Sequence, residues 1–325
     1  MGVNSYSEQI DIDNTYRLRM LISTLPPYAK DYFRGIQPHT ESRTRIAYAY
    51  DLNVFFSYLH ENNPIFAQKE IRDITLDDLE KLRPTDIEEY LEYLKVYDTT
   101  DVHPKETKQV TNSERGLFRK MSALRSFYNY FFKRQIIQKN PTLFVDMPKL
   151  HDKAIIRLDT DEVAKLLDYV ESCGSKLTGQ ALSYYNKTKE RDIAIITLLL
   201  GTGIRVSELV GLDLSDVDFN NNGVMVTRKG GSQMVVYFGE EVEKALRNYL
   251  ETYRKAVTPL AGYENALFLS TQRRRIGVQA VENMVKKYAS QITNKRITPH
   301  KLRSTYGTAL YQETGDIYLV ADVLG

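Results

Sequence analysis

The 325 residues are enough for two domains, each with a hydrophobic core of its own. Hydrophobic residues make up 42% of the chain and charged residues 26%, as in ordinary water-soluble globular proteins. The single cysteine, Cys173, excludes an intramolecular disulfide and a zinc site built from thiolates. Residues 1–16 are polar and partly acidic and do not resemble a secretory signal peptide, so we expect a cytoplasmic protein that is not inserted in a membrane.

The net charge of +2 conceals two strongly basic segments. Residues 105–139 contain nine Lys and Arg against two Glu, and residues 273–303 contain nine Lys and Arg against one Glu. The remainder of the chain is therefore acidic overall. Each segment by itself is more often a solvated charged helix. Two of them on an otherwise acidic protein favour a polyanion such as nucleic acid, held from two sides.

The first half of the sequence predicts a succession of helices. Apolar residues recur at helical spacing between residues 40 and 60. They form one stripe, with Phe55 and Leu59 beside it: Ala47, Tyr50, Val54 and Tyr58. Pro84 marks the start of another helix, because proline fits the first helical position. The helices expected in this half cover residues 16–25, 40–60, 76–82, 85–96 and 113–134.

The helix expected at residues 113–134 has two unlike faces. One face is apolar and carries Leu117, Met121, Leu124, Tyr128 and Phe131. The opposite face is basic and small-polar with almost no acidic residue, which suits a helix in the major groove of DNA, where phosphates and base edges both need donors. The residues expected to bind DNA from this helix are Arg115, Arg119, Ser122, Arg125 and Lys133.

The segment from Asn140 to Pro148 interrupts the helical pattern and predicts an extended linker, so we place the domain boundary near residue 150. After Leu214 the pattern changes from helical to extended, with Asn-rich and Gly-rich turns between short apolar runs. Strands are expected at residues 217–219, 224–227 and 234–238. One helix is expected to begin at about residue 160, and a second to end at residue 200. Further helices are expected to begin at residue 205 and at residue 300, and to span residues 241–253 and 278–290.

The octapeptide 202–209, Thr-Gly-Ile-Arg-Val-Ser-Glu-Leu, follows a buried apolar helix and begins a new one. Arg205 therefore lies at a helix start beside a hydrophobic core, where its guanidinium can face an anion and be held by Glu208 three residues later. The alternative is a helix-start arginine that is paired only with its own glutamate.

Two further motifs carry cations that can reach a phosphate. Lys229 stands on a glycine-rich hairpin turn, from which a lysine can enter a DNA groove; the alternative is a turn lysine that only keeps the surface soluble. His300 and Arg303 are three residues apart at a helix start, so an imidazole and a forked cation can face one phosphate. The alternative for His300 is a helix cap.

In combination, the motifs resemble those of a known family. Segments 202–209, 227–231 (Thr-Arg-Lys-Gly-Gly) and 298–303 (Thr-Pro-His-Lys-Leu-Arg) are similar to the core motifs of the tyrosine recombinase, or phage integrase, family. The Xer-like branch is the most similar, particularly its single-recombinase XerS type. The resemblance covers most of residues 155–325 and, more loosely, the helical first half.

This resemblance assigns roles to the motif residues. Arg205 and Arg303 would be the two catalytic arginines, Lys229 the hairpin lysine, His300 the first histidine of the site, and Glu208 the supporting acidic residue. It also implies a mainly α fold. Residues 1–150 would form a helical, SAM-like core-binding domain that binds DNA. Residues 151–325 would form a mostly helical catalytic domain with a small three-stranded antiparallel sheet.

The activity implied by the resemblance is site-specific DNA recombination through a 3′-phosphotyrosyl intermediate, in chromosome-dimer resolution or mobile-element integration. The reaction needs no metal and no other cofactor, and the partners would be duplex DNA and further copies of the chain, as a tetramer on paired sites. Two alternatives share the DNA partner: a non-catalytic DNA-binding accessory protein, and an enzyme of the type IB topoisomerase kind.

One feature departs from the family pattern. In the family a Leu-Gly-His motif is followed, roughly nine residues later, by the nucleophilic tyrosine. Here Leu324-Gly325 are the last residues of the sequence, so we expect a catalytic domain truncated at this end and inactive in cleavage. Tyr306, Tyr311 and Tyr318 do not occupy the position of the nucleophile, and truncation would also impair the tetramer.

Overall fold

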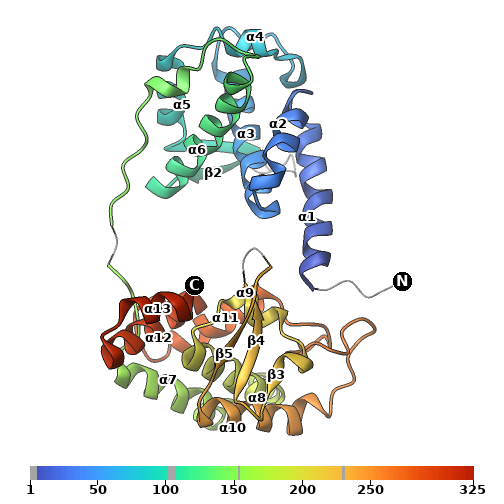
Figure 1. Cartoon of the computed structure of the whole chain (residues 1–325), viewed down its shortest axis with the longest axis vertical. Coiled ribbons are helices and arrows are strands. Elements are labelled where there is room, and N and C mark those ends of the chain that lie inside the picture. The colour runs from blue at the N-terminus through green and yellow to red at the C-terminus, as the bar shows by residue number, and fades with distance from the viewer. Residues whose placement is uncertain (1–5, 101–106, 153, 229–230) are drawn as a thin grey trace. The chain divides into compact units, whose positions relative to one another are not determined.

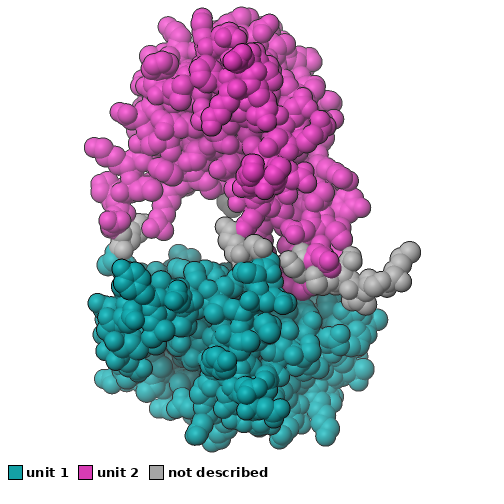
Figure 2. All heavy atoms as spheres, in the orientation of Figure 1, with its two compact units in different colours: residues 1, 154–325 teal, residues 2–153 magenta. Residues whose placement is uncertain are grey.

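The computed structural model describes residues 6–100, 107–152, 154–228 and 231–325. The chain divides into two compact units: residues 2–153, which Figure 2 shows in magenta as unit 2, and residues 154–325, which it shows in teal as unit 1. The sequence placed this boundary near residue 150. In chain order, we call residues 2–153 the first unit and residues 154–325 the second unit, and we describe each by itself.

The first unit is built mainly from helices whose starts follow from local chemistry (Figure 1). Thr75 and Asp78 form a reciprocal capping box at one helix start, Pro84 occupies the first turn of the next, and the Ser113 hydroxyl accepts from the backbone of a third. The helices are α1 (Tyr6–Ser23), α2 (Ala29–Ile36), α3 (Ser42–Asn62), α4 (Leu76–Leu79), α5 (Pro84–Tyr93) and α6 (Glu114–Lys133), with 3₁₀ turns η1 (Gln37–His39), η2 (Ile71–Asp73) and η3 (Pro141–Phe144).

The core of the first unit lies between α3 and α6. The apolar stripe predicted for α6 is confirmed, with Met121 and Phe131 at most 2% exposed. The stripe predicted for α3 is confirmed at Tyr58, which is 5% exposed, but was wrong at Tyr50, which is 42% exposed and whose hydroxyl accepts from Arg17. The centre of the buried side lies one to two positions away and includes Phe55 and Leu59, which were predicted beside the stripe. Its fully buried apolar residues are Leu52, Phe55, Phe56 and Leu59.

The first unit also contains an antiparallel strand pair that the sequence interpretation did not predict. Strand β1 (Val96–Thr100) pairs with β2 (Thr107–Thr111), with Val96 opposite Thr111. Both segments are rich in valine and threonine, whose branched side chains favour extended backbone. The helix expected to reach residue 96 therefore ends at Tyr93, where α5 stops.

The second unit is a group of helices beside one small sheet (Figure 1). Its helices are α7 (Thr160–Ser172), α8 (Gly179–Thr202), α9 (Val206–Gly211), α10 (Glu240–Tyr249), α11 (Val278–Ala289), α12 (Pro299–Thr314) and α13 (Ile317–Leu324). Short turns η4 (Cys173–Lys176) and η5 (Leu214–Asp216) and a π-helical segment η6 (Leu250–Arg254) complete the helical part. The strands are β3 (Val217–Asp218), β4 (Gly223–Thr227) and β5 (Gln233–Tyr237).

The sheet has the order β3-β4-β5 and is antiparallel throughout, with Val224 opposite Val217 on one side and Val236 on the other. Each strand begins and ends within one residue of its predicted bounds. The turn between β3 and β4 contains Asn222 at φ 49°, a left-handed conformation that asparagine tolerates. The predicted fold class, mainly α with a small three-stranded antiparallel sheet, is confirmed.

Helix α8 forms the centre of the second unit. Its residues from Ala194 to Leu199 are apolar apart from Thr197, and each apolar side chain is fully buried. Burying such side chains stabilises the fold by about 1.5–3 kcal/mol each. Among the described residues, no helix is both long enough and apolar enough to cross a membrane.

Candidate functional site

The junction of α8 and α9 places Arg205 and Glu208 together. Helix α8 ends at Gly203, which adopts the left-handed conformation (φ 62°). Arg205 is then the N-cap of α9, and its backbone N–H donates to Glu208 Oε2 at 2.7 Å. Its side chain donates from Nη1 to Glu208 Oε1 at 2.9 Å, while the glutamate side chain is only 4% exposed. Glu208 therefore fixes both the backbone and one guanidinium arm of Arg205.

Helix α12 brings Arg303 to the same place. Pro299 starts the helix, and Arg303 one turn later is 8% exposed. Its Nη1 donates to the carbonyl of Gly203 at 2.6 Å and its Nη2 donates to the carbonyl of Leu324. The carbonyl that holds one arm of Arg303 therefore belongs to Gly203, two residues before Arg205 in the sequence.

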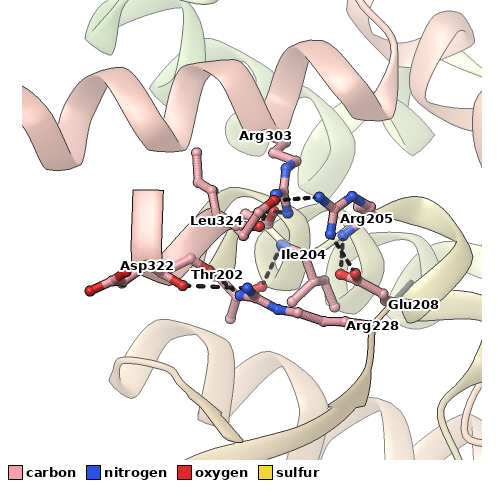
Figure 3. A network of polar contacts seen from close by, with 11 residues as sticks. Thr202, Ile204, Arg205, Glu208, Arg228, Arg303, Asp322 and Leu324 are labelled. Atoms are coloured by element: carbon pink, nitrogen blue, oxygen red, sulfur yellow. Dashed lines mark hydrogen bonds and ion pairs between the residues drawn. The ribbon is translucent and has the colours of Figure 1, made fainter. Parts of the chain in front are cut away.

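The end of α13 lies against these arginines (Figure 3). The other arm of Arg205 donates to the carbonyl of Gly325 at 2.6 Å. A third arginine, Arg228, follows β4 and donates to carbonyls in the last turn of α13. The sequence interpretation did not assign Arg228 a role, although it precedes Lys229 in the Thr-Arg-Lys-Gly-Gly motif.

Three guanidinium groups at one place create a strongly positive site. Burial lowers the pKa of Arg303, and the nearby charges of Arg205 and Arg228 lower it further, while Glu208 acts in the opposite direction. Arginine remains protonated in proteins, so the lowered pKa reports the cost of burying a positive charge beside two others. The neutral carbonyls of Gly203 and Leu324 accept from Arg303, but they supply no compensating charge. An anion at this place would supply it and would receive forked, charge-assisted hydrogen bonds.

The remaining predicted site residues differ in how the structure places them. His300 is exposed in the first turn of α12, one turn before Arg303. Lys229 lies outside the described residues. Among the described residues, no group of three or more His, Cys, Asp or Glu is arranged to hold a metal ion.

Tyr306 and Thr305 have structural contacts in α12. The hydroxyl of Thr305 accepts from the backbone N–H of Leu158 at 3.0 Å and so ties α12 to the start of the second unit. The ring of Tyr306 packs against Gly203, where an added Cβ would overlap it. This contact explains why the position after the helix end has no side chain.

The basic face predicted on α6 is divided by its contacts. Arg119 forms an ion pair with Asp51 at 2.8 Å, although nearly half of its side chain is exposed. Arg125 donates to the carbonyls of Thr142 and Val145 and so holds the segment that follows η3 against α6. These arginines have structural partners within their own unit, which the face pattern alone could not reveal.

The other three residues predicted on this face are placed as follows. The hydroxyl of Ser122 donates to the carbonyl of Phe118 at 2.8 Å, a bond within the helix. Arg115 and Lys133 have exposed side chains at opposite ends of α6. A ligand could therefore reach two cations about five turns apart on this helix.

The second basic segment is also partly engaged. Arg275 pairs with Asp213, and Lys295 bonds to both Asp159 and Glu162. The hydrogen bond from Lys295 lowers the pKa of Glu162 to about 2. Exposed cations remain elsewhere in the segment, at Arg273, Arg274, Lys286, Lys287 and Arg296.

Comparison with known proteins gives consistent relatives. The sequence profile of the phage integrase family matches residues 156–325. The tyrosine recombinase XerS of Lactococcus lactis subsp. cremoris (strain MG1363) is 32% identical over 95% of this chain and 90% of its own length. That of Streptococcus pneumoniae (strain P1031) is 34% identical over 95% and 91%. The Tn1549 transposon integrase in complex with circular intermediate DNA has a similar fold, with a TM-score of 0.61, 20% identity and 90% of each chain covered.

Proposed function

Because the chain belongs to the phage integrase family, we propose that it is a site-specific DNA recombinase, which breaks and rejoins strands through a 3′-phosphotyrosyl intermediate. Relatives that match nearly the whole chain are named tyrosine recombinases, and this supports the assignment. The observation that carries it is the convergence of Arg205 and Arg303, from two helices far apart in sequence, on one electropositive place.

The chemistry requires such a pair of arginines. When a nucleophile attacks a DNA phosphate, negative charge grows on the two non-bridging oxygens, and preorganised cations stabilise that charge most strongly. Arg205 and Arg303 are preorganised because Glu208 and the carbonyl of Gly203 each hold one of their arms. In this proposal the remaining arms and His300 contact the phosphate.

The leaving 5′-oxygen needs a proton, and we assign Lys229 as the residue that donates it. It directly follows Arg228 in the sequence, and the contact of Arg228 with α13 beside Arg303 supports this assignment. The proposed reaction requires no metal or nucleotide, because the covalent phosphotyrosyl bond retains the energy of the phosphodiester.

We assign DNA binding to both units. The first unit would act as the core-binding domain, with Arg115 and Lys133 of α6 contacting the DNA backbone. The second would act as the catalytic domain. Exchange of strands between two sites requires several copies of the protein on paired DNA, and we propose a tetramer for this step.

We further propose that a polypeptide of residues 1–325 binds DNA but forms no covalent adduct. Tyr306 packs against the backbone of Gly203, and no hydrogen bond places its hydroxyl among the described arginines. Tyr311 is 47% exposed and Tyr318 is 81% exposed, which supports the absence of a catalytic role for either.

Selection from a random duplex library tests the proposal. Residues 1–325 should enrich sequences that contain two inverted half-sites, because paired recombinase molecules impose their symmetry on the DNA. The enriched duplex, carrying a nick, should give a covalent protein–DNA product with the protein expressed from the intact gene and none with residues 1–325. Failure to bind any duplex at low salt would contradict the recombinase assignment, and an adduct with residues 1–325 would contradict the assignment of the tyrosines.

A further inference from the structure

Arg228 is attached differently from the other two arginines of the site. Arg205 and Arg303 each use one guanidinium arm on their own helix junction and the other on the end of α13. Arg228 gives both arms to α13, with Nη1 donating to the carbonyl of Asp322 at 3.4 Å and Nη2 to that of Val323 at 2.5 Å. Its Nε is buried and has no hydrogen-bond partner in the part of the chain that the structure describes.

Helix α13 depends on such contacts at its end. Ile317 is 59% and Tyr318 81% exposed, while Val320 is buried at 8% exposure. The carbonyls of Asp322, Val323 and Leu324 accept from arginines outside the helix, and α13 itself has no basic residue in its last turn. Cations from elsewhere in the fold therefore have a large effect on its position.

The last residues of α13 pack closely against the site. A Cβ on Gly307 would lie 2.7 Å from Leu324 Cδ1, and a Cβ on Gly203 would lie 2.9 Å from Leu324 Cδ2. Leu324 thus fills a niche that exists because both positions are glycine. The guanidinium of Arg228 packs in the same way on Gly325, where an added Cβ would overlap it. The turn formed by Leu324 and Gly325 is consequently fixed by its side chain and by its carbonyls.

We propose that Arg228 is a positioning residue that keeps the end of α13 docked while a DNA phosphate occupies Arg205 and Arg303. This inference rests on the proposed function. A phosphate is an ionised acceptor that can receive forked hydrogen bonds from an arginine, and it adds a charge attraction that a neutral carbonyl lacks. It will therefore take the arms of Arg205 and Arg303 that now bond to Leu324 and Gly325.

Arg228 remains as the cation that holds the turn in this state. Both of its arms stay on Asp322 and Val323, the two residues directly before those whose oxygens the other arginines release. Because Arg228 directly follows β4, the same contact ties the hairpin strand to α13. The turn at Leu324 and Gly325 then stays beside the bound phosphate.

Hydrogen–deuterium exchange of the amides in residues 317–325 tests this inference, with and without saturating duplex DNA. Saturation is checked by mobility shift for each protein. In the unmutated chain, DNA should leave the exchange rates unchanged. In Arg228→Ala, the free protein should exchange modestly faster, and DNA should accelerate exchange by a further tenfold or more, because the last anchor is missing. Lys244→Ala, which removes an exposed cation of α10, is the matched control and should behave as the unmutated chain.

Arg228→Lys gives an independent reading in case the alanine variant folds poorly. Its single ammonium group cannot bridge two carbonyls as a guanidinium fork does. DNA should therefore accelerate amide exchange in this variant, but less than in the alanine variant. An identical response of all variants to DNA would overturn the inference, as would DNA-induced exchange in the unmutated chain. If the unmutated chain binds no DNA, the proposed function fails. In that case the inference is tested by amide exchange of residues 317–325 in the DNA-free Arg228→Ala protein alone. Exchange rates equal to those of the unmutated chain would refute the anchoring contact.

Discussion

The buried charge cluster between α3 and α6 allows a sharp stability prediction. Asp51 is 1% exposed at its side chain, with Lys120 Nζ 3.0 Å from Oδ1 and Arg119 Nη1 2.8 Å from Oδ2. Burial raises the pKa of Asp51 although both cations oppose the shift, so the ionised carboxylate depends on its partners. The Lys120 side chain is 6% exposed and that of Arg119 is 47% exposed.

These exposures predict unequal costs for the two cations. Replacing Lys120 by Met keeps the packed stem but leaves a buried carboxylate with one half-solvated partner, which should cost about 3 kcal/mol, the lower end of the range for broken buried pairs. Arg119→Ala should cost about 1 kcal/mol or less, because solvent screens a half-exposed pair and Lys120 remains.

Urea unfolding followed by circular dichroism measures both costs in the transition of the first unit. Lys133→Ala, at the exposed end of the same helix, is the control and should change stability by no more than about 0.5 kcal/mol. The reasoning is refuted if Lys120→Met costs less than about 1 kcal/mol, or if Arg119→Ala costs as much as Lys120→Met.

Three further predictions concern pH, DNA binding and proton donation. The pKa of Glu162 is lowered to about 2 from 4.5, so its stabilising effect is present above pH 4.5 and is lost as the pH falls toward 2. Glu162→Gln should therefore cost about 1 kcal/mol in thermal melts near pH 7 and almost nothing near pH 2. An equal cost at both pH values would disprove the linkage. Arg115→Ala combined with Lys133→Ala should reduce the slope of log DNA affinity against log salt concentration by about one unit per lost phosphate contact. Lys30→Ala on α2 is the control and should leave the slope unchanged. An unaltered slope in the double variant would exclude α6 from the DNA interface. In the protein expressed from the intact gene, Lys229→Ala should slow the cleavage of ordinary DNA about a hundredfold. The same variant should cleave DNA with a 5′-bridging sulfur at nearly the unmutated rate, because a thiolate leaves without a proton. Equal impairment on both substrates would exclude Lys229 as the proton donor.

Much of the fold follows from local patterns in the sequence. The α6 stripe, the three strands of the second unit and the helix start at Arg205 all depend on periodicity, turn residues and caps within a few positions. The strand pair β1–β2 was missed because a helical reading was extended through Val96, and short apolar runs fit both structures. On α3 the stripe was displaced because tyrosines satisfy the helical period on more than one face, and Tyr50 turned out to be exposed.

The contacts of the arginine cluster were predictable only where both partners are close in the sequence. The pair of Arg205 and Glu208 is local and could be expected from their spacing. The bonds from Arg228 to α13 join residues 94 and 95 positions apart, and those of Arg125 reach carbonyls 17 and 20 positions away. Such partners are carbonyls, which every residue possesses, so no side-chain pattern announces them. Whether a cation faces solvent or the protein's own backbone is decided by tertiary packing.

The claim that Arg205 and Arg303 act on one DNA phosphate is tested most directly by the single-turnover rate of covalent adduct formation. The protein expressed from the intact gene is mixed with the nicked duplex that it selects, and the affinity of each variant is measured separately. Arg205→Ala and Arg303→Ala should each lower the rate by about a hundredfold to a thousandfold, with DNA affinity much less affected, because their charge is needed most in the transition state. Adduct formation at the unmutated rate by either variant, or a loss of rate explained wholly by weaker DNA binding, would contradict the proposed site.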